Sequence, residues 1–219
     1  AALKGFSHAA IVDFDSLAAT SETFAAGRAL HIPVLNGFET RVFIREWADR
    51  EINSPGEPGI FYLVGFGYTE PPSKNSPAGI LLHTLHTISE ARNREVIHRL
   101  NAHLKPCTID YTEDVLPLTP SHNPTERHII SAYLAKSRTL FENALADFWG
   151  PIVGIDTASD TTLIAQETKL QETIRTVLIK KGGPGYIAPA ADTFPSLEEV
   201  ATAITASGGI VTGTWLDGS

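Results

Sequence analysis

Three stretches of the 219-residue chain share one pattern, a helix-like segment followed by a turn and an apolar run that ends on a carboxylate. These stretches are residues 1–15, 25–39 and 196–217. The acids at their ends are Asp13, Asp15, Glu39 and Asp217. Parallel β-strands joined by helices place their carboxyl ends along one rim, so the pattern predicts that these acids converge on one pocket.

Composition narrows the class of protein. A chain of this length with 42% hydrophobic residues is long enough for one sizeable α/β core, and a single domain is the simpler expectation. A net charge of −8 disfavours a nucleic-acid or anionic-membrane partner, because such partners repel an acidic surface. With Cys107 as the only cysteine, a disulfide within the chain is excluded, which favours a reducing, cytoplasmic setting.

Apolar runs alternate with helix-like patterns along the chain, which predicts an α/β protein. The crossover rule for consecutive strands favours a parallel sheet or a barrel. The predicted strands are residues 9–12, 32–35, 41–44, 60–66 and 208–215. The predicted helices include residues 21–30 and 123–141. Residues 45–59 and 69–79 are predicted as surface loops because they are rich in charge, proline and serine.

Helix starts are predicted from capping residues. Thr87 and Glu90 have the spacing of a capping box, as do Ser196 and Glu199. Asn123 followed by Pro124 and Glu126 predicts another start, and Asp160 a further one.

The ends of the chain suggest a longer protein. Residues 1–5 have the pattern of a final helical turn, and the last predicted strand ends only four residues before Ser219. An isolated barrel would then have two unpaired edges. We therefore expect an internal portion of a longer protein or a processed product.

Asp13, Asp15 and Glu39 are the candidate metal ligands. Carboxylate oxygens are the donors that magnesium, manganese and calcium prefer. The alternative is that these acids are solvated strand-end residues or helix caps, and for Asp15 the two interpretations are equally supported. Glu39 is the stronger candidate, because it follows Asn36, Gly37 and Phe38 at an expected strand exit where no cap is required.

Arg127 and His128 are the candidate catalytic residues. They lie in the first turn of a predicted helix, where free backbone N–H groups attract anions and a guanidinium can bind phosphate. The alternative is that Arg127 pairs with a nearby acid and His128 packs along the helix. His83 and His86 have metal-ligand spacing, but apolar neighbours favour a half-buried packing role for them.

Several segments resemble, in order, the PHP (polymerase and histidinol phosphatase) domain family. The segment Lys4–Arg41 resembles the family's second and third strands with the helix between them. Its Ile-Val-Asp-Phe-Asp-Ser-Leu-Ala and Val-Leu-Asn-Gly-Phe-Glu stretches correspond to the family's Thr-Asp-His-Asp and Gly-Ile-Glu motifs. Residues 60–68 resemble the next strand, and residues 123–135 resemble the helix with an Arg-Pro-His-Ile signature. Residues 196–215 resemble the helix and strand that end in Ala-His-Pro.

The chain also departs from this family. No counterpart of the first strand, with its His-x-His motif, or of the last strands is present. Phe14 and Trp215 stand where the resemblance expects histidines, and a further histidine expected near Tyr62 is absent. Of the usual ligands, only Glu39 carries over directly.

The resemblance implies one PHP-like α/β domain over residues 1–219, a partial or distorted β/α barrel related to the TIM barrel. It also implies a metal-dependent phosphoesterase that hydrolyses a small phosphorylated molecule with divalent manganese, zinc or magnesium. The barrel could be completed either by a second copy of the chain or by a missing segment. One alternative is a non-catalytic PHP-like module that binds a ligand or protein. Another is an unrelated β/α protein that uses Arg127 and His128 to bind a phosphorylated metabolite.

Overall fold

The computed structural model describes residues 4–155, 166–189 and 193–214, which form two compact units. The first unit comprises residues 1–88 and 189–219, and the second comprises residues 89–188. Asp160 and Asp217, a predicted helix cap and one of the predicted rim acids, lie outside the described residues.

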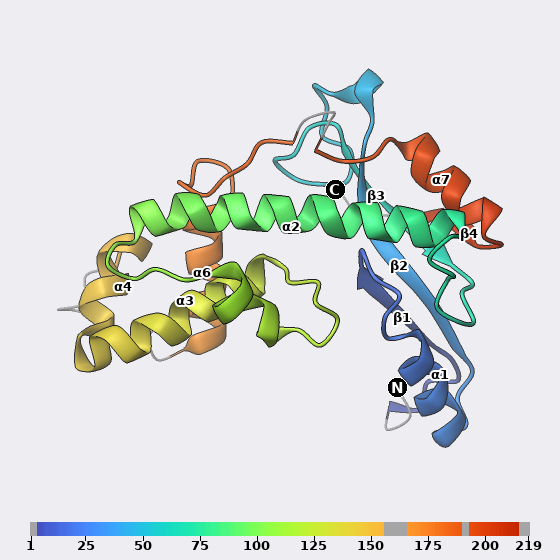
Figure 1. Ribbon diagram of the computed structural model, residues 1–219, viewed down its shortest axis with the longest axis horizontal. Coiled ribbons are helices and arrows are strands. Elements are labelled where there is room, and N and C mark those ends of the chain that lie inside the picture. The colour runs from blue at the N-terminus through green and yellow to red at the C-terminus, as the bar shows by residue number, and fades with distance from the viewer. Residues whose placement is uncertain (1–3, 156–165, 190–192, 215–219) are drawn as a thin grey trace. The chain divides into compact units, whose positions relative to one another are not determined.

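The first unit contains a four-stranded sheet in the order β1-β2-β3-β4 (Figure 1). The strands are β1 (Ala9–Phe14), β2 (Val34–Phe43), β3 (Ile60–Phe66) and β4 (Ile210–Gly213). β1 and β2 are parallel, whereas β3 is antiparallel to both β2 and β4. The expectation of a parallel sheet was therefore wrong for β3 and β4, and the described sheet is mixed. β2 and β3 follow one another without an intervening crossover helix, so the chain reverses direction between them.

β2 shows how the two faces of the sheet differ. Phe38, Thr40 and Val42 are buried, while the alternating residues Glu39 and Arg41 are only partly buried. Side chains alternate between the faces of a strand, so one face of β2 lies in the core and the other carries charged groups. The apolar core on the buried side includes Phe38, Val42, Leu63, Leu81, Leu85, Val200 and Ile204.

Two helices of the first unit contact this sheet, α1 (Thr20–Ala29) and α7 (Leu197–Ala206). The predicted start of α7 is confirmed, because the Ser196 hydroxyl accepts the backbone N–H of Glu199 and the Glu199 carboxylate accepts the N–H of Ser196. The segment 45–59 contains a short 3-10 helix, η2 (Arg45–Trp47), before β3 begins.

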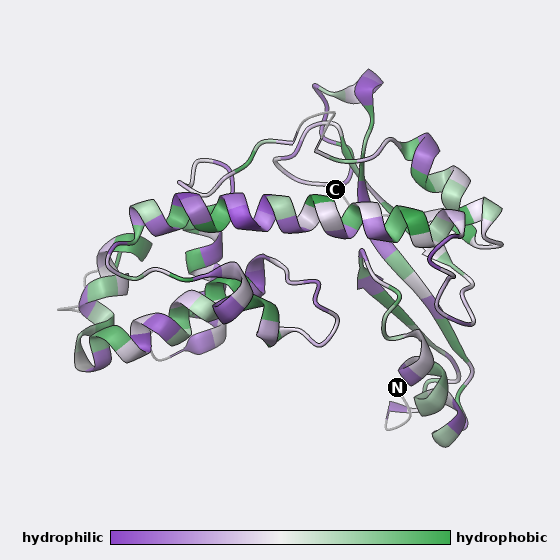
Figure 2. Cartoon of the chain, viewed as in Figure 1, coloured by the Kyte–Doolittle hydropathy of each residue, from purple (hydrophilic) through white to green (hydrophobic). Residues whose placement is uncertain are grey.

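Helix α2 (Pro77–His103) begins ten residues earlier than its predicted cap at Thr87. The Thr87 hydroxyl donates to the carbonyl of His83, one turn earlier in the same helix. The prediction was wrong because a Thr-x-x-Glu spacing also arises inside a helix. Ser76 supplies the start instead, with its hydroxyl accepting the N–H of Gly79. Figure 2 shows a polar middle for this helix, where residues 89–95 lie.

The second unit is helical. Its elements after α2 are η3 (Tyr111–Val115), η4 (Leu116–Leu118), α3 (Glu126–Phe141), η5 (Glu142–Ala144), α4 (Leu145–Val153) and α6 (Glu167–Ile179). Trp149 is fully buried in its core, and its indole N–H donates to the Ser137 hydroxyl over 2.9 Å. The core also contains Leu100, Leu104, Ile129, Ile130, Tyr133, Leu170, Ile174 and Leu178.

The α/β class predicted from the sequence is confirmed. The described strands form an open sheet, so a partial or distorted barrel stays a prediction, as does the assignment of the whole chain to one PHP-like domain. Within the described residues, no helix combines the length and the apolar character needed to cross a membrane.

Candidate active site in the first unit

Glu39 lies inside β2 and not at its exit, which corrects the predicted position. The strand continues to Phe43 because Gly37 through Phe43 pair with β3 along their whole length. The side chain of Glu39 is held by a residue that follows β4, at the edge of the sheet. The hydroxyl of Thr214, directly after β4, donates to Glu39 Oε1 over 2.8 Å. This bond orients the carboxylate.

Asp13 and Asp15 lie differently with respect to Glu39. Asp13 is a residue of β1 and pairs in register with Phe38, whereas Phe14 pairs with Glu39. Side-chain alternation therefore places Asp13 on the face opposite to Glu39. Asp15 follows the strand, and its backbone N–H donates to the Glu39 carbonyl over 2.8 Å. Of the two aspartates, only Asp15 is connected to Glu39 by a backbone hydrogen bond among the described contacts.

The surroundings of Asp15 are unusual for a carboxylate. Its φ of 53° lies in the left-handed region, which residues other than glycine rarely adopt. Burial raises the pKa of Asp15 to about 6, against the lowering effects of Thr40 and Arg41. Its Oδ1 is buried and has no hydrogen-bond partner among the described residues. A buried carboxylate oxygen without a donor is costly, so it is suited to a positively charged group.

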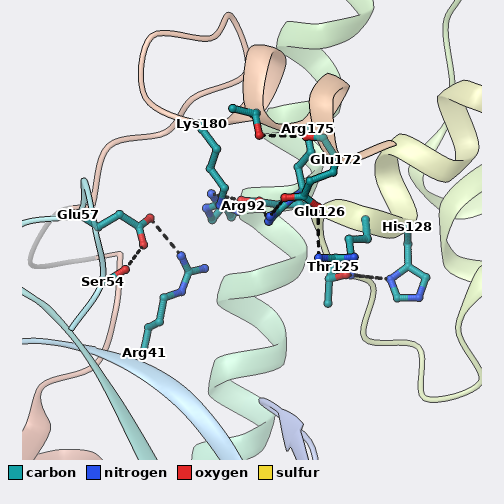
Figure 3. A network of polar contacts seen from close by, with 12 residues as sticks. Arg41, Ser54, Glu57, Arg92, Thr125, Glu126, His128, Glu172, Arg175 and Lys180 are labelled. Carbon is teal, nitrogen blue, oxygen red and sulfur yellow. Dashed lines mark hydrogen bonds and ion pairs between the residues drawn. The ribbon is translucent and has the colours of Figure 1, made fainter. Parts of the chain in front are cut away.

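Arg41 is the charged group that lies nearest in sequence on the same face as Glu39. Its guanidinium pairs with Glu57 at 3.4 Å, and the other oxygen of Glu57 accepts the Ser54 hydroxyl over 2.6 Å (Figure 3). The guanidinium carbon lies 5.5 Å from the ring centroid of Phe14 and 4.5 Å from that of Phe194. Such cation–π contacts hold the planar group in place.

Tyr62 completes the polar face. It pairs in register with Arg41, and its ring lies 6.3 Å from that of Phe14. Burial raises the pKa of Tyr62, and the charge of Arg41 opposes that rise. The loop residue Asn53 accepts the backbone N–H of Tyr62 in β3 and donates to the carbonyl of Thr214, the residue directly after β4.

Arg41, Glu57 and Thr214 were not identified from the sequence. One signal was present, because the alternation in Glu39-Thr40-Arg41 places the carboxylate and the guanidinium on one face. No local sequence pattern indicates that Glu57 contacts Arg41 or that Thr214 contacts Glu39, because each pair joins segments distant in the chain.

The donors present fit a divalent metal only in part. Asp15 and Glu39 offer hard oxygen ligands, and Asp15 Oδ1 is available. Across the described ranges, however, no three histidine, cysteine or acidic side chains come together as a metal-binding group. A centre of two or three ions requires further ligands than these.

Arg127 and His128 lie in the second unit, in the first turn of α3. Thr125 caps this helix and Asn123 does not, which corrects the predicted start. His128 Nδ1 lies 3.0 Å from the backbone nitrogen of Thr125, so the imidazole is part of a capping box (Figure 3). Arg127 pairs with Glu172 at 3.2 Å, and 58% of its side chain is exposed.

Next to them, Glu126 is the centre of an ion-pair cluster in the same unit. Its carboxylate pairs with Arg92, Arg175 and Lys180 at 3.0, 3.3 and 2.9 Å. Burial raises its pKa, but the charges of Arg92 and Lys180 outweigh burial and lower it to about 2. These bonds connect α2, α3 and the end of α6 within the second unit.

The other candidate histidines, His83 and His86, belong to no group of three or more potential metal ligands among the described residues. His83 is exposed and His86 is partly buried on α2.

Two solved structures are similar in fold to this chain. One similar solved structure is a proposed metal-dependent phosphoesterase from Bifidobacterium adolescentis, with a TM-score of 0.60 and 19% identity. Another is an amidohydrolase from Chromobacterium violaceum, with bound sulfate and no metal, with a TM-score of 0.62 and 17% identity. The fold of this chain is therefore similar to the matched part of both proteins. Each match covers 96% of this chain but 57% of the other, so this chain spans little more than half of those proteins. No protein-family model and no curated protein matches it.

Proposed function

We propose that this chain forms the larger part of a metal-dependent phosphoesterase of the PHP type, acting on a small phosphorylated molecule. The observation that carries the proposal is the fold match over 96% of the chain to a proposed phosphoesterase of this kind. Because the chain spans 57% of that protein, the remaining ligands are proposed to come from parts of the protein outside this chain.

Within the first unit, Glu39 and Asp15 are the proposed metal ligands. A bound divalent ion supplies Lewis-acid polarisation of a phosphoryl oxygen and a lowered pKa for water. The residues of the chain prepare for this role: Thr214 orients Glu39, and Asp15 keeps a buried oxygen without a hydrogen-bond donor. In the second unit, the partly exposed side chain of Arg127 is proposed as an anion-binding group at the start of α3. His128 is proposed to support it by fixing the first turn of α3.

The test is an assay of the full-length protein with manganese and para-nitrophenyl phosphate. Glu39→Gln is expected to lower turnover by about 10- to 100-fold, because the variant removes a ligand charge while keeping the side-chain shape. Glu46→Gln is the matched control, since Glu46 is exposed on η2 in the same unit. Equal turnover of both variants, or no metal-dependent turnover in the full-length protein, contradicts the proposal.

A second candidate function is a non-catalytic PHP-like module that binds a ligand or a protein. Phe14 favours it, because this ring stands where the resemblance expects a histidine ligand and contacts Arg41 instead. Elemental analysis of the full-length protein separates the two candidates. Two or more bound metal ions per chain remove the module hypothesis, and a metal-free protein that is catalytically silent supports it.

A further inference from the structure

β1 is an edge strand of the sheet in the first unit, and among the described strands it pairs with β2 alone (Figure 1). The backbone N–H groups of Ala9 and Asp15 donate to carbonyls on the β2 side, over 3.1 and 2.8 Å. Successive N–H groups of a strand point to opposite sides, so those of Ala10 and Val12 point away from β2. The open edge of β1 therefore presents backbone groups that are suited to pairing with a further strand.

The side chains of β1 do not suit an edge strand. Residues 9–12 are all apolar, and β1 contains neither lysine nor proline, the residues that commonly prevent pairing at an open edge. Ile11 and Val12 point to opposite faces, and they are 40% and 37% exposed. An uninterrupted apolar run is typical of a parallel strand that is covered on both faces. β1 thus has the composition of an interior strand in the position of an edge strand.

On the face of Ile11, the apolar surface continues into a groove between β1 and α1. The groove has a volume of about 370 Å³, and its lining includes Ile11, Ala26, Leu30 and Val34. Leu30 is 57% exposed. Glu22 is the only charged residue in this lining among the described residues. A contiguous apolar groove beside an open strand edge is suited to apolar side chains of a bound segment.

On the opposite face, exposed apolar side chains also lie beside the open edge. Val12 pairs in register with Gly37, and Ala10 pairs with Leu35. These four residues therefore share one face of the sheet. Leu35 is 59% exposed. Both faces of the sheet are thus apolar and accessible at β1.

Two observations indicate which kind of segment covers this edge. The chain spans 57% of each of the two similar solved proteins, so both have a large part without a counterpart among these 219 residues. A second copy of this chain is disfavoured, because two chains with a net charge of −8 each repel one another. A segment of the same full-length protein meets no such association cost, since it is tethered to the sheet.

We infer that an apolar β-strand, from a part of the full-length protein outside these 219 residues, pairs with the open edge of β1. Apolar side chains of the same part fill the groove beside α1. The backbone groups of Ala10 and Val12 form the ladder to this strand. The inference rests on the proposed function in one respect, that the full-length protein extends beyond these residues.

The experiment is amide hydrogen exchange of the full-length protein, resolved to single residues by mass spectrometry. Val12 is compared with Ile11, whose N–H points toward β2 and serves as the internal control. If a strand pairs with the edge, the Val12 amide is expected to exchange within about tenfold of the rate of Ile11. An amide at an open edge exchanges much faster than its paired neighbour, so a larger difference between the two overturns the inference.

The same measurement at a series of protein concentrations distinguishes the two possible occupants. Analytical ultracentrifugation gives the concentration at which the full-length protein is monomeric. Slow exchange of Val12 in the monomer supports the inference. Slow exchange that is lost when the protein is diluted to the monomer assigns the edge to a second copy and overturns the inference.

A pair of isoleucine variants tests the coverage of the side chains. Ile11→Lys is expected to lower the urea midpoint of the full-length protein about threefold more than Ile80→Lys, because a covered lysine lies in apolar surroundings. Ile80 is the matched control, since it is 56% exposed on α2 in the same unit. Equal shifts overturn the inference. The exchange measurement requires no variant, so it decides the matter even if Ile11→Lys does not fold.

The outcomes separate this inference from the proposed function. Fast exchange of Val12 in a full-length protein with metal-dependent phosphoesterase activity overturns the inference and leaves the proposal standing. Slow exchange of Val12 in a monomer that hydrolyses no phosphoester supports the inference and contradicts the proposal.

Discussion

The hydroxyl of Thr214 donates to Oε1 of Glu39 over 2.8 Å, and these two residues are 175 positions apart in the chain. The bond connects the end of β4 to the middle of β2 across the intervening strand β3. The orientation of the main candidate ligand therefore depends on the last part of the described chain.

Thr214→Val is expected to lower the free energy of unfolding by about 1 kcal/mol, because valine keeps the shape but leaves Glu39 Oε1 without this donor. Urea denaturation followed by circular dichroism measures the change. Thr202→Val is the control, since Thr202 is exposed on α7. A loss no greater than that of the control shows that the Thr214 bond contributes nothing measurable.

Gly37→Ala is expected to destabilise the first unit by about 1–3 kcal/mol, through overpacking between two backbones. An added Cβ would clash with the carbonyl oxygen of Gly65 on the neighbouring strand, and a backbone cannot move aside as a side chain can. Chemical denaturation tests the prediction against Gly56→Ala. Gly56 has open space around it and a φ of 77°, so its replacement costs about 1 kcal/mol through backbone strain alone. The reverse order of the two effects contradicts the packing argument.

The ion pairs of Glu126 are expected to make the free energy of unfolding fall at acidic pH. Its pKa is about 2 in the folded protein and 4.5 in the unfolded reference. A lowered folded pKa contributes stability above the unfolded pKa, and this stability is lost as the pH falls from about 4.5 through about 2. The contribution is on the order of 3 kcal/mol at neutral pH.

Glu126→Gln removes this titration. The difference in free energy of unfolding between parent and variant is expected to be largest above pH 5 and to shrink as the pH approaches 2, which denaturation at a series of pH values measures. Glu90→Gln is the control, because Glu90 forms an exposed pair with Arg94 that contributes only about 0.3–0.5 kcal/mol. A difference that does not vary with pH shows that the Glu126 pairs do not have this role.

Ser196→Ala is expected to cost about 1 kcal/mol by removing the cap of α7. The hydroxyl of Ser196 accepts the N–H of Glu199, and this contact fixes the start of a helix that packs on the sheet through Val200 and Ile204. Thermal unfolding compares it with Ser121→Ala, a change at an exposed residue outside the helices. An equal, small shift in both variants would show that the cap is dispensable.

Much of the fold could be predicted where local signals are strong. The strand at residues 60–66, the helix after Ser196 and the α/β class follow from apolar runs and capping boxes, which report on local structure alone. The starts of α2 and α3 could not be placed correctly. Thr87 and Asn123 have the composition of caps, and only the packing of the surrounding helix decides which of several such residues takes that position.

The candidate site divides in the same way. The sequence by itself determined extended segments on both sides of Glu39, because apolar runs report on the local backbone. It placed Glu39 at a strand exit, and only the pairing of β2 with β3 showed that Glu39 and Arg41 share one face of a continuous strand. It also determined that Asp15 follows a strand. Only the tertiary structure decided that β3 runs antiparallel to β2, that Thr214 orients Glu39 and that Glu57 pairs with Arg41. These contacts join segments distant in the chain, and their energies depend on burial and on partners that no local pattern encodes.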